Sequence, residues 1–402
     1  MRGALLGLAL WVGCATPEGV CPGAALTAEP GAAFALVSSD YASTSVALLD
    51  ERGAPLTEAW IDSGSAPPGI VASLSGDVAV ASVAVDPCVV AVIDRFGTDV
   101  ISFLDHCAGA VVSQVDVGSS FRANPHDVLP LGGGRVLVSR HEPNPDPDAD
   151  ERERGDDLLI VDWREGRVVS RIALSSAALT QDGERLHARP SRMAWLGERV
   201  VIGLARSTTD FMVTGPGAVA LLDPESGALE VIPLDGLAGC DEVDSGDATV
   251  LVTCGGPAFV DEDARRERAG LALLAEEGGV IRVRHTWRAA AHPALPAYNT
   301  WGIPVGADRA VVTAMGDLSR GIHDRVGVID LATGHAETLL EAGSAFVIGD
   351  GAWDPVAEML LIPDAHDGTL RRFTGAGLDP LSRMEVDGCR GLPPREVRPI
   401  RN

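Results

Sequence analysis

An acidic stretch in the first half of the chain has the spacing of a cation-binding loop. In NPDPDADERERGDD, residues 144–157, four carboxylates stand at ligand positions: Asp146, Asp148, Asp150 and Asp157. Ca²⁺ prefers oxygen ligands at such alternating positions. Glu151 occupies the place where the sharp turn of a calcium loop needs Gly, and Arg152 brings positive charge close. The charge pattern therefore favours the alternative, a solvated acidic loop without a metal.

Four of the seven cysteines have the spacing of hairpin disulfides. In PCVVAVIDRFGTDVISFLDHC, Cys88 and Cys107 are equally distant from a turn near Gly97. In CDEVDSGDATVLVTC, Cys240 and Cys254 flank a Ser-Gly-Asp turn in the same way. Residues at equal distances from a hairpin turn face each other within disulfide reach. We therefore predict the pairs Cys88–Cys107 and Cys240–Cys254.

The remaining cysteines are Cys14, near the N-terminus, and Cys21 and Cys389, near opposite ends of the fold. If Cys14 carries a lipid, six cysteines remain, an even number that suggests disulfides in an exported protein. The third predicted pair is then Cys21–Cys389. Metal ligation is the alternative for these cysteines, but the sequence contains no Cys-x-x-Cys motif and no His cluster to support it.

The N-terminal segment predicts export. Arg2 supplies a positive charge, and the apolar run Ala4–Gly13 is too short to cross a bilayer, which needs about 20 residues. With Cys14 directly behind a small residue, the arrangement resembles the bacterial lipoprotein signal, in which the cysteine is acylated. The resemblance implies a signal peptide over 1–13, lipidation of Cys14 and a lipidated tether over 14–30. The alternative is an ordinary secreted protein in which Cys14 is removed or paired.

The composition excludes some classes of function. The chain of 402 residues has no Lys and a net charge of −25. A partner with a phosphate backbone requires clustered Lys and Arg, so nucleic acid is not an expected partner. A hydrophobic content of 46% excludes wholesale disorder. The expected partners are a membrane of the cell envelope, which holds the protein through its lipid anchor, and a protein or small molecule that the sequence does not identify.

The elements that must position any site come from a short repeat. Each copy begins with two apolar residues, which an Asp follows in most copies. A few turn residues come next, then in most copies a Gly, and finally a β-rich run. Its copies are LLDERGAPL from Leu48, FLDHCAGAVV from Phe103, IVDWREGRVV from Ile160, LLDPESGALE from Leu221, LLAEEGGVIR from Leu273, VIDLATGHAE from Val328 and a degenerate RRFTGAGLDPL from Arg371. Such an Asp accepts a hydrogen bond from the backbone two residues on, and Gly supplies the positive φ that closes a hairpin. The period of roughly 50–60 residues is typical of propeller blades.

Seven units of four short strands predict an all-β, seven-bladed β-propeller of antiparallel blades over residues 31–390, with 391–402 as a C-terminal tail. The predicted blade limits are 31–64, 69–118, 124–176, 188–237, 239–289, 296–345 and 346–388. The first unit is one strand short. We therefore expect the N- and C-terminal segments to share one blade, with Cys21–Cys389 locking the closure.

Three stretches of the repeat resemble the units of bacterial YVTN-like propellers, and specifically of exported propeller lipoproteins from GC-rich genomes. These are NPHDVLPL at Asn124, GDDLLIVD at Gly155 and GPGAVALLDPESG at Gly215. The resemblance extends over nearly the whole mature chain. It implies the fold and export, and it implies no particular activity.

In a propeller, the loops that lead into the innermost strands line one mouth of the central channel. Polar or aromatic residues at those positions are Asp77, Asn124, His126, Asp127, Arg189, Arg192, Asp241, Glu242, Asn299, Trp301 and Asp350. Such a ring could hold Ca²⁺, the one cofactor that the pattern allows, and calcium-dependent propeller lactonases are similar in this respect. The alternative, which we favour, is that these residues are polar because the channel is wet and because Asp and Asn cap turns.

No catalytic motif is apparent in the sequence. There is no G-x-S-x-G elbow, no H-E-x-x-H, no phosphate-binding Gly loop and no haem-attachment motif. His126 and Asp127 are neighbours on a predicted strand and so point to opposite faces, which gives no dyad. We therefore expect a non-catalytic binding or interaction scaffold without a cofactor. The alternative is a calcium-dependent hydrolase or lyase with its site at the channel mouth.

Overall fold

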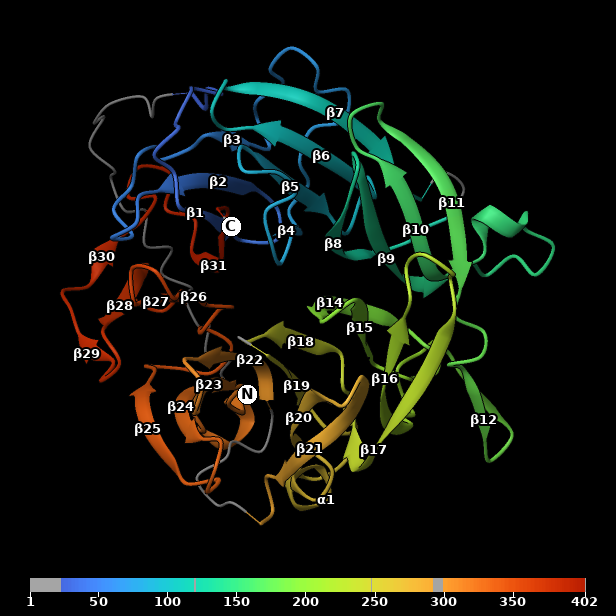
Figure 1. Cartoon of the computed structure of the whole chain (residues 1–402). Helices are drawn as coiled ribbons and strands as arrows, with labels where there is room; N and C mark the ends of the chain where they lie inside the picture. The colour runs from blue at the N-terminus through green and yellow to red at the C-terminus, as the bar shows by residue number, and fades with distance from the viewer. Residues whose placement is uncertain (1–22, 119–120, 247, 292–298, 402) are drawn as a thin grey trace, which may run out of the picture.

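The structure, a computed structural model, describes residues 23–118, 121–246, 248–291 and 299–401. In this part of the chain, seven antiparallel sheets stand around one axis and form a β-propeller (Figure 1), which confirms the predicted fold class. Helical structure is limited to the short segments η1 (Glu151–Glu153), α1 (Glu262–Arg266) and η2 (Leu318–Arg320). No helix among the described residues is long and apolar enough to span a bilayer.

Blades 2 to 4 each follow the chain from the innermost to the outermost strand. Their strands are β4 (Val78–Val80), β5 (Val89–Asp94), β6 (Val100–Asp105) and β7 (Ala110–Asp116); β8 (Pro125–Gly132), β9 (Arg135–Pro143), β10 (Gly155–Asp162) and β11 (Arg167–Ala173); and β14 (Pro190–Leu196), β15 (Arg199–Leu204), β16 (Pro216–Leu222) and β17 (Leu229–Ala238). A separate two-stranded ribbon, β12 (Leu179–Gln181) and β13 (Glu184–Leu186), lies in the connection between blades 3 and 4.

Blades 5 to 7 continue the same order. Their strands are β18 (Glu242–Ser245), β19 (Thr249–Cys254), β20 (Gly270–Glu277) and β21 (Val280–Arg288); β22 (Asn299–Val305), β23 (Arg309–Ala314), β24 (Arg325–Asp330) and β25 (Ala336–Glu341); and β26 (Ala352–Asp354), β27 (Met359–Asp364), β28 (Thr369–Thr374) and β29 (Asp379–Pro380), with β30 (Met384–Glu385) also paired to β28. Each of these strand sets lies within its predicted blade limits.

Blade 1 is shared by both ends of the chain, as predicted. Its innermost strand is the C-terminal β31 (Pro394–Pro399), followed outward by β1 (Phe34–Ser39), β2 (Thr44–Leu49) and β3 (Ile61–Asp62). Strand β31 pairs antiparallel with β1, so that red and blue strands meet in Figure 1. The predicted separation of a propeller ending at residue 390 from a C-terminal tail is therefore not seen, because the tail supplies a strand of the ring.

The blades are held together by a core that they share. All six residues of the middle strand β5, VVAVID, are buried, whereas the outermost strand β7 alternates between exposed and covered positions. One apolar cluster combines Ile93 of blade 2 with Val128 and Val138 of blade 3. A middle strand is covered on both faces by neighbouring blades, and this explains why the middle strands are continuously apolar.

The Asp–Gly hairpins have the predicted turn chemistry. The Asp50 carboxylate accepts a hydrogen bond from the Arg52 amide at 2.8 Å, and Asp223 accepts one from the Glu225 amide at 3.0 Å. Gly53 closes its turn at φ 72°. The repeated pattern is therefore the connection between the third and fourth strands of a blade.

Both predicted hairpin disulfides are present. Cys88 is bonded to Cys107, with the Cα atoms 5.4 Å apart, and Cys240 is bonded to Cys254. Neither pair lies directly across its ladder. Because Val89 pairs with Asp105, Cys88 stands one position out of register with Cys107, just beyond the end of the ladder. Equal spacing about the turn thus identified the two cysteine pairs correctly but did not predict the register of the paired strands.

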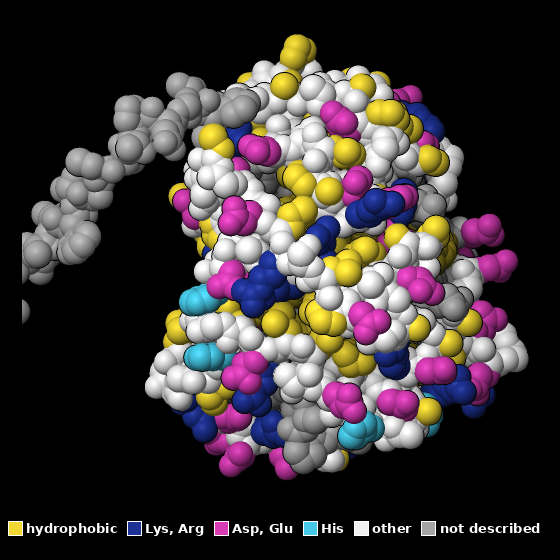
Figure 2. All heavy atoms as spheres, turned by 90° about the vertical axis from the view of Figure 1, so that its left-hand side faces the viewer, with side chains coloured by type: hydrophobic (Ala, Val, Ile, Leu, Met, Phe, Trp, Pro, Cys, Tyr) yellow, Lys and Arg dark blue, Asp and Glu magenta, His cyan; other side chains and the backbone are white. Residues whose placement is uncertain are grey.

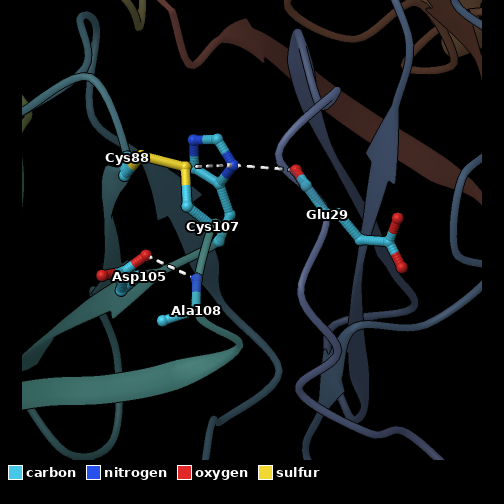
Figure 3. The surroundings of a disulfide bond; sticks show 6 residues. Glu29, Cys88, Asp105, Cys107 and Ala108 are labelled. Carbon is cyan, nitrogen blue, oxygen red and sulfur yellow. Dashed lines mark hydrogen bonds between the residues drawn. A yellow bond between two sulfur atoms is a disulfide. The ribbon is translucent and has the colours of Figure 1, made fainter.

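The segment before β1 packs against the ring near the first disulfide. The Glu29 amide donates to the His106 carbonyl at 2.6 Å, and the His106 ring contacts the Glu29 carbonyl oxygen at 3.0 Å through Nδ1. Figure 3 shows Glu29 opposite the bonded Cys88 and Cys107. Trp60 also donates to the Thr27 carbonyl at 3.0 Å. Residues 23–30, predicted as part of a tether, are therefore bound to blades 1 and 2.

Two predictions fall on residues that the structure does not describe. Cys14 and Cys21 both lie outside the described residues, so lipidation of Cys14 and the pair Cys21–Cys389 stay predictions. Cys389 itself takes part in a disulfide.

On one side of the ring, the acidic side chains are dispersed over the surface. Figure 2 shows single acidic side chains spread over this side of the molecule, with arginines between them. A dispersed acidic surface keeps a protein soluble without forming a specific site. At the axis of the ring, by contrast, charged side chains are concentrated.

Candidate binding site in the central channel

The innermost strands bring eight charged side chains together at the propeller axis. This set, called the channel cluster below, consists of Asp127, Arg192, Asp241, Glu242, Asp244, Asp350, Glu396 and Arg398. They belong to β8, β14, β18 and β31, and to the loops that lead into β18 and β26. Six carboxylates stand against two guanidinium groups, so the cluster carries an excess of four negative charges when every group is ionised.

Arg192 lies at the centre of the channel cluster. Its Nη2 donates to Glu396 at 2.6 Å, and its Nη1 donates to the Val80 carbonyl at 3.1 Å. The carboxylates of Glu242 and Asp350 lie 3.8 and 3.7 Å away. Burial opposes the charge of Arg192, but the surrounding carboxylates outweigh it and hold the pKa of this guanidinium above its usual value.

Glu396 is the best-compensated carboxylate of the channel cluster that faces Arg192. It also accepts a hydrogen bond from Arg398 Nε at 2.7 Å, and Arg398 Nη2 reaches Asp350 at 3.2 Å. Burial alone would raise the pKa of Glu396, but Arg192 and Arg398 outweigh it and lower the pKa to about 2. Both arginines of the cluster are therefore shared between Glu396 and Asp350.

Three carboxylates at the start of blade 5 are left with little compensation. Among the described residues, no side chain forms a hydrogen bond with the carboxylates of Asp241, Glu242 or Asp244. Burial raises the pKa of Glu242 to about 8, although Arg192 lowers it. Burial likewise raises the pKa of Asp241 and of Asp244 to about 6. Perturbed carboxylates in a channel mark a candidate functional site, because a ligand can supply the missing compensation.

Asp127 lies within the channel cluster, but its hydrogen bonds serve to hold neighbouring blades together. It is fully buried and accepts hydrogen bonds from the Ser82 amide and hydroxyl, both at 2.9 Å, and from the Met193 amide at 2.8 Å. These contacts join blades 2, 3 and 4 at the axis. Arg192 approaches Asp127 only to 3.8 Å.

A pocket of about 230 Å³ opens at the end of the axis where the innermost strands begin. This upper pocket is lined in part by Tyr41, Asp77, Phe346, Asp350, Arg395 and Glu396. Asp350 and Glu396 also belong to the channel cluster, so the upper pocket leads directly to it. The Asp77 carboxylate forms a salt bridge with Arg95 at 2.5 Å.

A larger pocket of about 590 Å³ opens at the opposite end of the innermost strands. This lower pocket is lined by residues of blades 1, 2, 5, 6 and 7, among them Asp244, Trp353, Arg398 and Arg401. The channel cluster therefore lies between two openings and can be reached from both ends of the axis.

A stack of planar groups lies beside the channel in blades 3 and 4. The rings of His126 and His141 are parallel with centroids 4.2 Å apart, and Phe211 follows at 6.2 Å from His141. The Arg189 guanidinium carbon lies 3.8 Å from the centre of the Phe211 ring. Burial lowers the pKa of His141 to about 3 and holds that of His126 well below its usual value, so both imidazoles are neutral at pH 7.

His126 has a partner that the sequence did not reveal. Its Nδ1 lies 2.9 Å from the hydroxyl of Ser191, one residue before Arg192. Ser191 is 1% exposed. A nucleophile must reach its substrate, so this buried serine orients the imidazole and is not suited to attack a ligand in the channel.

The remaining predicted mouth residues are not ligands of the channel cluster. Trp301 is 1% exposed and packs in an apolar cluster with Ile303 and Val311, so the expectation of a ligand-facing Trp301 is wrong. Asn124 adopts φ 48°, and its amide donates to Asp99 at 2.8 Å, which is a turn function. Asn299 begins β22, and its side chain lies outside the described residues.

Arg189 is also placed away from the cluster. Its Nη1 forms a salt bridge with Glu142 at 2.7 Å, and its Nη2 donates to the carbonyls of Thr208 and Thr209 at 3.0 and 3.1 Å. It therefore fixes the loop that carries Phe211 and does not face a ligand.

The four candidate calcium ligands of the acidic loop do not converge on one point. Asp157 is fully buried and lies between Arg140, whose Nε and Nη2 both reach it at 2.8 Å, and Arg171. Asp146 and Asp148 are exposed, and the Asp146 carboxylate accepts a hydrogen bond from the Asp148 amide of the same loop at 2.9 Å. The ligand set fails because Asp157 points into blade 3 and is neutralised there, and Asp150, the remaining member, lies in the same exposed loop.

The geometry of the acidic groups does not fit a bound metal ion. In the described ranges, one trio of His, Cys, Asp or Glu has its ligand atoms within 4.8 Å of one another: Cys88, Asp105 and Cys107. Its two sulfur atoms are joined in a disulfide. Ca²⁺ takes six to eight converging oxygens, and the carboxylates of the channel cluster are spread more widely than that.

Sequence reasoning missed Glu396, Arg398 and Asp244. Glu396 and Arg398 lie in PREVRP, a run with Val397 between them, and alternate residues of a strand face the same side. Treating this run as the missing innermost strand of blade 1 would have pointed both side chains toward the axis. Asp244 shares its face of β18 with Glu242 for the same reason.

Comparison with known proteins supports the fold and assigns no function. No family model matches the chain, and no curated protein matches it. A putative 6-phosphogluconolactonase from Bacteroides uniformis superimposes with a TM-score of 0.57 at 12% identity, covering 92% of this chain and 100% of that one. The Pseudomonas aeruginosa periplasmic gluconolactonase PpgL gives 0.52 at 15%, covering 92% and 98%. Dihydro-heme d1 dehydrogenase NirN, in complex with DHE, gives 0.50 at 15%, covering 95% and 78%. The class defined by fold and site is thus a seven-bladed propeller with a charged axial channel.

Proposed function

We propose that this protein is a non-catalytic binding scaffold of the cell envelope whose recognition site is the channel cluster and the upper pocket above it. The observation that carries the proposal is the charge imbalance at the axis, where Asp241, Glu242 and Asp244 lack side-chain hydrogen-bond partners among the described residues. These three side chains are half-buried, so water compensates their carboxylates in the ligand-free protein. A ligand with positive charge or hydrogen-bond donors that displaces this water would gain the interaction with them.

The envelope location is supported by the disulfides. Cys88–Cys107 and Cys240–Cys254 are both formed, and such bonds persist in oxidising compartments. Together with the export signal around Cys14, they support an exported, lipid-anchored protein. Residues 23–33 run along the end of the ring opposite the upper pocket, because they lead into β1 where β31 ends. The upper pocket therefore faces away from the anchored end.

The second candidate function is a hydrolase, and one observation favours it. A carboxyl group with its pKa raised to about 8, such as that of Glu242, can donate a proton at neutral pH. Two of the structural neighbours are named as lactonases. Against this, Ser191 is inaccessible, and the spacing of the carboxylates does not suit a divalent ion that would activate water.

Mass spectrometry under native conditions, on protein isolated from its own membrane fraction, tests the proposal. A retained small molecule is the expected result, together with a thermal shift by that molecule that is lost in Glu242→Gln and kept in Glu225→Gln. Glu225 lies on an exposed outer turn and is the matched control. Copurifying calcium, a lower melting temperature with EDTA and hydrolysis of gluconolactone would instead support the hydrolase.

A further inference from the structure

The upper pocket has aromatic walls as well as a charged floor. The side chain of Tyr41 is 67% exposed and that of Phe346 is 52% exposed, and both line the pocket. Arg395 lies between their two loops. Its Nε donates to the Ser39 carbonyl at 3.0 Å, its Nη1 donates to the Phe346 carbonyl at 3.4 Å, and its guanidinium carbon lies 5.0 Å from the Tyr41 ring centre. Two exposed rings are thus fixed on one opening.

The loop that presents Phe346 is held by one buried carboxylate. Asp324 is 1% exposed and accepts hydrogen bonds from the amides of Phe346 at 3.0 Å, Val347 at 2.7 Å, Ile348 at 2.9 Å and Gly316 at 2.6 Å. Four bonds to one carboxylate fix the path of the loop. The Phe346 ring is therefore presented on a rigid support and is not a side chain left over on a mobile tip.

The loop that presents Tyr41 is fixed in a similar way. The Asp40 carboxylate accepts from the amides of Ala42 at 2.9 Å and Ser43 at 2.7 Å, and the Tyr41 amide donates to the Ser39 hydroxyl at 2.9 Å. Gly76 packs directly on this turn, since a Cβ added there would meet the Tyr41 carbonyl oxygen at 2.2 Å. The exposure of Tyr41 is thus built into the fold.

The charges below these rings determine the sign of the ligand. Asp77 is matched by Arg95, and Glu396 by Arg192 and Arg398. Asp350 shares Arg398 and Arg192 with Glu396, and Asp241 and Glu242 lie beyond it. Arg395, which lines the pocket between the two rings and donates to carbonyl oxygens, adds one positive charge at the opening. His126 is neutral at pH 7, so it does not change the balance. When Asp77, Arg95 and Arg395 are counted with the channel cluster, seven carboxylates face four guanidinium groups if all are ionised, so a ligand that passes Tyr41 and Phe346 meets an excess of negative charge.

We propose that the upper pocket binds a small organic cation, an amine or quaternary ammonium compound, with its apolar part against Tyr41 and Phe346 and its charge directed to Asp350 and the channel cluster. This rests on the proposed function and adds the chemical class of the ligand. Aromatic faces attract cations, and quaternary ammonium groups are recognised by aromatic rings in this way. A diffuse cation suits carboxylates that are too far apart to converge on a bare metal ion.

Isothermal titration with choline as the probe tests this class. Its neutral isostere 3,3-dimethyl-1-butanol and calcium chloride are the comparison ligands. We expect choline to bind at pH 8.5 and to bind about ten-fold more weakly at pH 5.5, because protonation of Glu242, Asp241 and Asp244 removes the negative charge that attracts it. Phe346→Ala should weaken choline about ten-fold. Phe259→Ala removes a ring that is 64% exposed and does not line the pocket, and it should leave the affinity unchanged.

Three outcomes overturn the inference. Equal binding of the alcohol and choline would show that charge is not recognised, while channel binding as proposed above would stand. Binding of calcium alone would replace the organic cation by a metal and would favour the hydrolase. Failure of every cation to bind, with a retained neutral or anionic molecule seen by native mass spectrometry, would reject the ligand class and leave the proposed function intact.

Discussion

Two groups of charges in this propeller are built from the same residue types and differ in burial and in how completely they are compensated. In blade 3, the Asp157 carboxylate lies between Arg140 and Arg171. In the channel, six carboxylates share Arg192 and Arg398. A closed set of ion pairs fixes a blade, whereas an open set at the axis leaves groups that a ligand can satisfy. The comparison explains why Asp157, a candidate calcium ligand, is structural and why the channel is the better candidate for function.

The same comparison applies at the edge of the upper pocket. Asp324 is as deeply buried as Asp157 but is compensated by four backbone amides in place of arginines. It therefore supports the binding surface without taking part in it. The carboxylates that build the ring are both buried and compensated, whereas those available to a ligand are half-buried and have fewer partners.

The largest effect is expected when the closed set in blade 3 is broken. Arg140→Met removes the two hydrogen bonds to Asp157 and should lower the free energy of unfolding by about 3–5 kcal/mol, because a buried charge loses a partner. Urea denaturation measures this. The double variant Arg140→Met/Asp157→Leu should recover part of the loss. A change below about 1 kcal/mol in the single variant would mean that Arg171 alone suffices and that the set is not closed by Arg140.

The second prediction concerns the open set in the channel. The pKa of Glu242 is about 8 in the folded protein and about 4.3 in an unfolded chain, so the folded state binds more protons between these values. This group makes no difference to stability below about pH 4, lowers stability progressively between about pH 4 and pH 8, and has a constant effect above pH 8. We expect Glu242→Gln to stabilise the ligand-free protein at pH 8.5 by about 1–4 kcal/mol.

Parallel urea titrations of both proteins at pH 5 and pH 8.5 measure the Glu242 effect. The variant should have a flatter pH dependence than the natural sequence. An equal slope in both proteins would place the uncompensated charge elsewhere in the cluster.

A smaller effect is expected at Asp324. Asp324→Asn keeps the size of the side chain but replaces one carboxylate oxygen with an NH2 group, which is a donor. The four backbone amides therefore lose part of their hydrogen bonding. The free energy of unfolding should fall by about 1–3 kcal/mol, and choline affinity should fall with it because Phe346 is held less firmly. Thermal unfolding and titration calorimetry give the two values. If the variant lost stability and kept its choline affinity, the hydrogen bonds of Asp324 would not contribute to ligand binding.

The smallest effect is expected in the exposed acidic loop. Asp146→Asn should change the unfolding free energy by less than about 0.5 kcal/mol, as is usual for surface substitutions. Added calcium or EDTA should not alter that result. If calcium raised the melting temperature of the natural sequence and not that of the variant, the acidic loop would bind calcium. Asp146 would then be a ligand, and the contrast drawn with the structural Asp157 would be wrong.

Much of the ring followed from local sequence rules. The Asp and Gly of each hairpin act on residues two to four positions away, so a short pattern such as LLDERGAPL is enough to identify a turn. The blade limits and the sharing of blade 1 follow from counting these turns. The partners Cys88 and Cys107 could be found because they flank one hairpin. Each of these features depends on residues that are close in the chain.

The candidate site could be predicted only in part. Asp127, Arg192, Asp241, Glu242 and Asp350 were expected at the channel mouth and do meet at the axis. Trp301 was expected there and is in the core. A shift of one residue turns a strand side chain to the opposite face, so a position near the start of a strand does not tell which way it points.

The amino-acid sequence by itself determined the repeated hairpin, the number of blades and two disulfides, because these depend on turn chemistry and on alternation over a few residues. Only the tertiary structure decided which charges compensate one another. Arg192 and Glu396 are 204 positions apart and become partners when β31 completes blade 1. Electrostatic balance is a property of distances across the closed ring, and those distances exist only after the two ends of the chain have met.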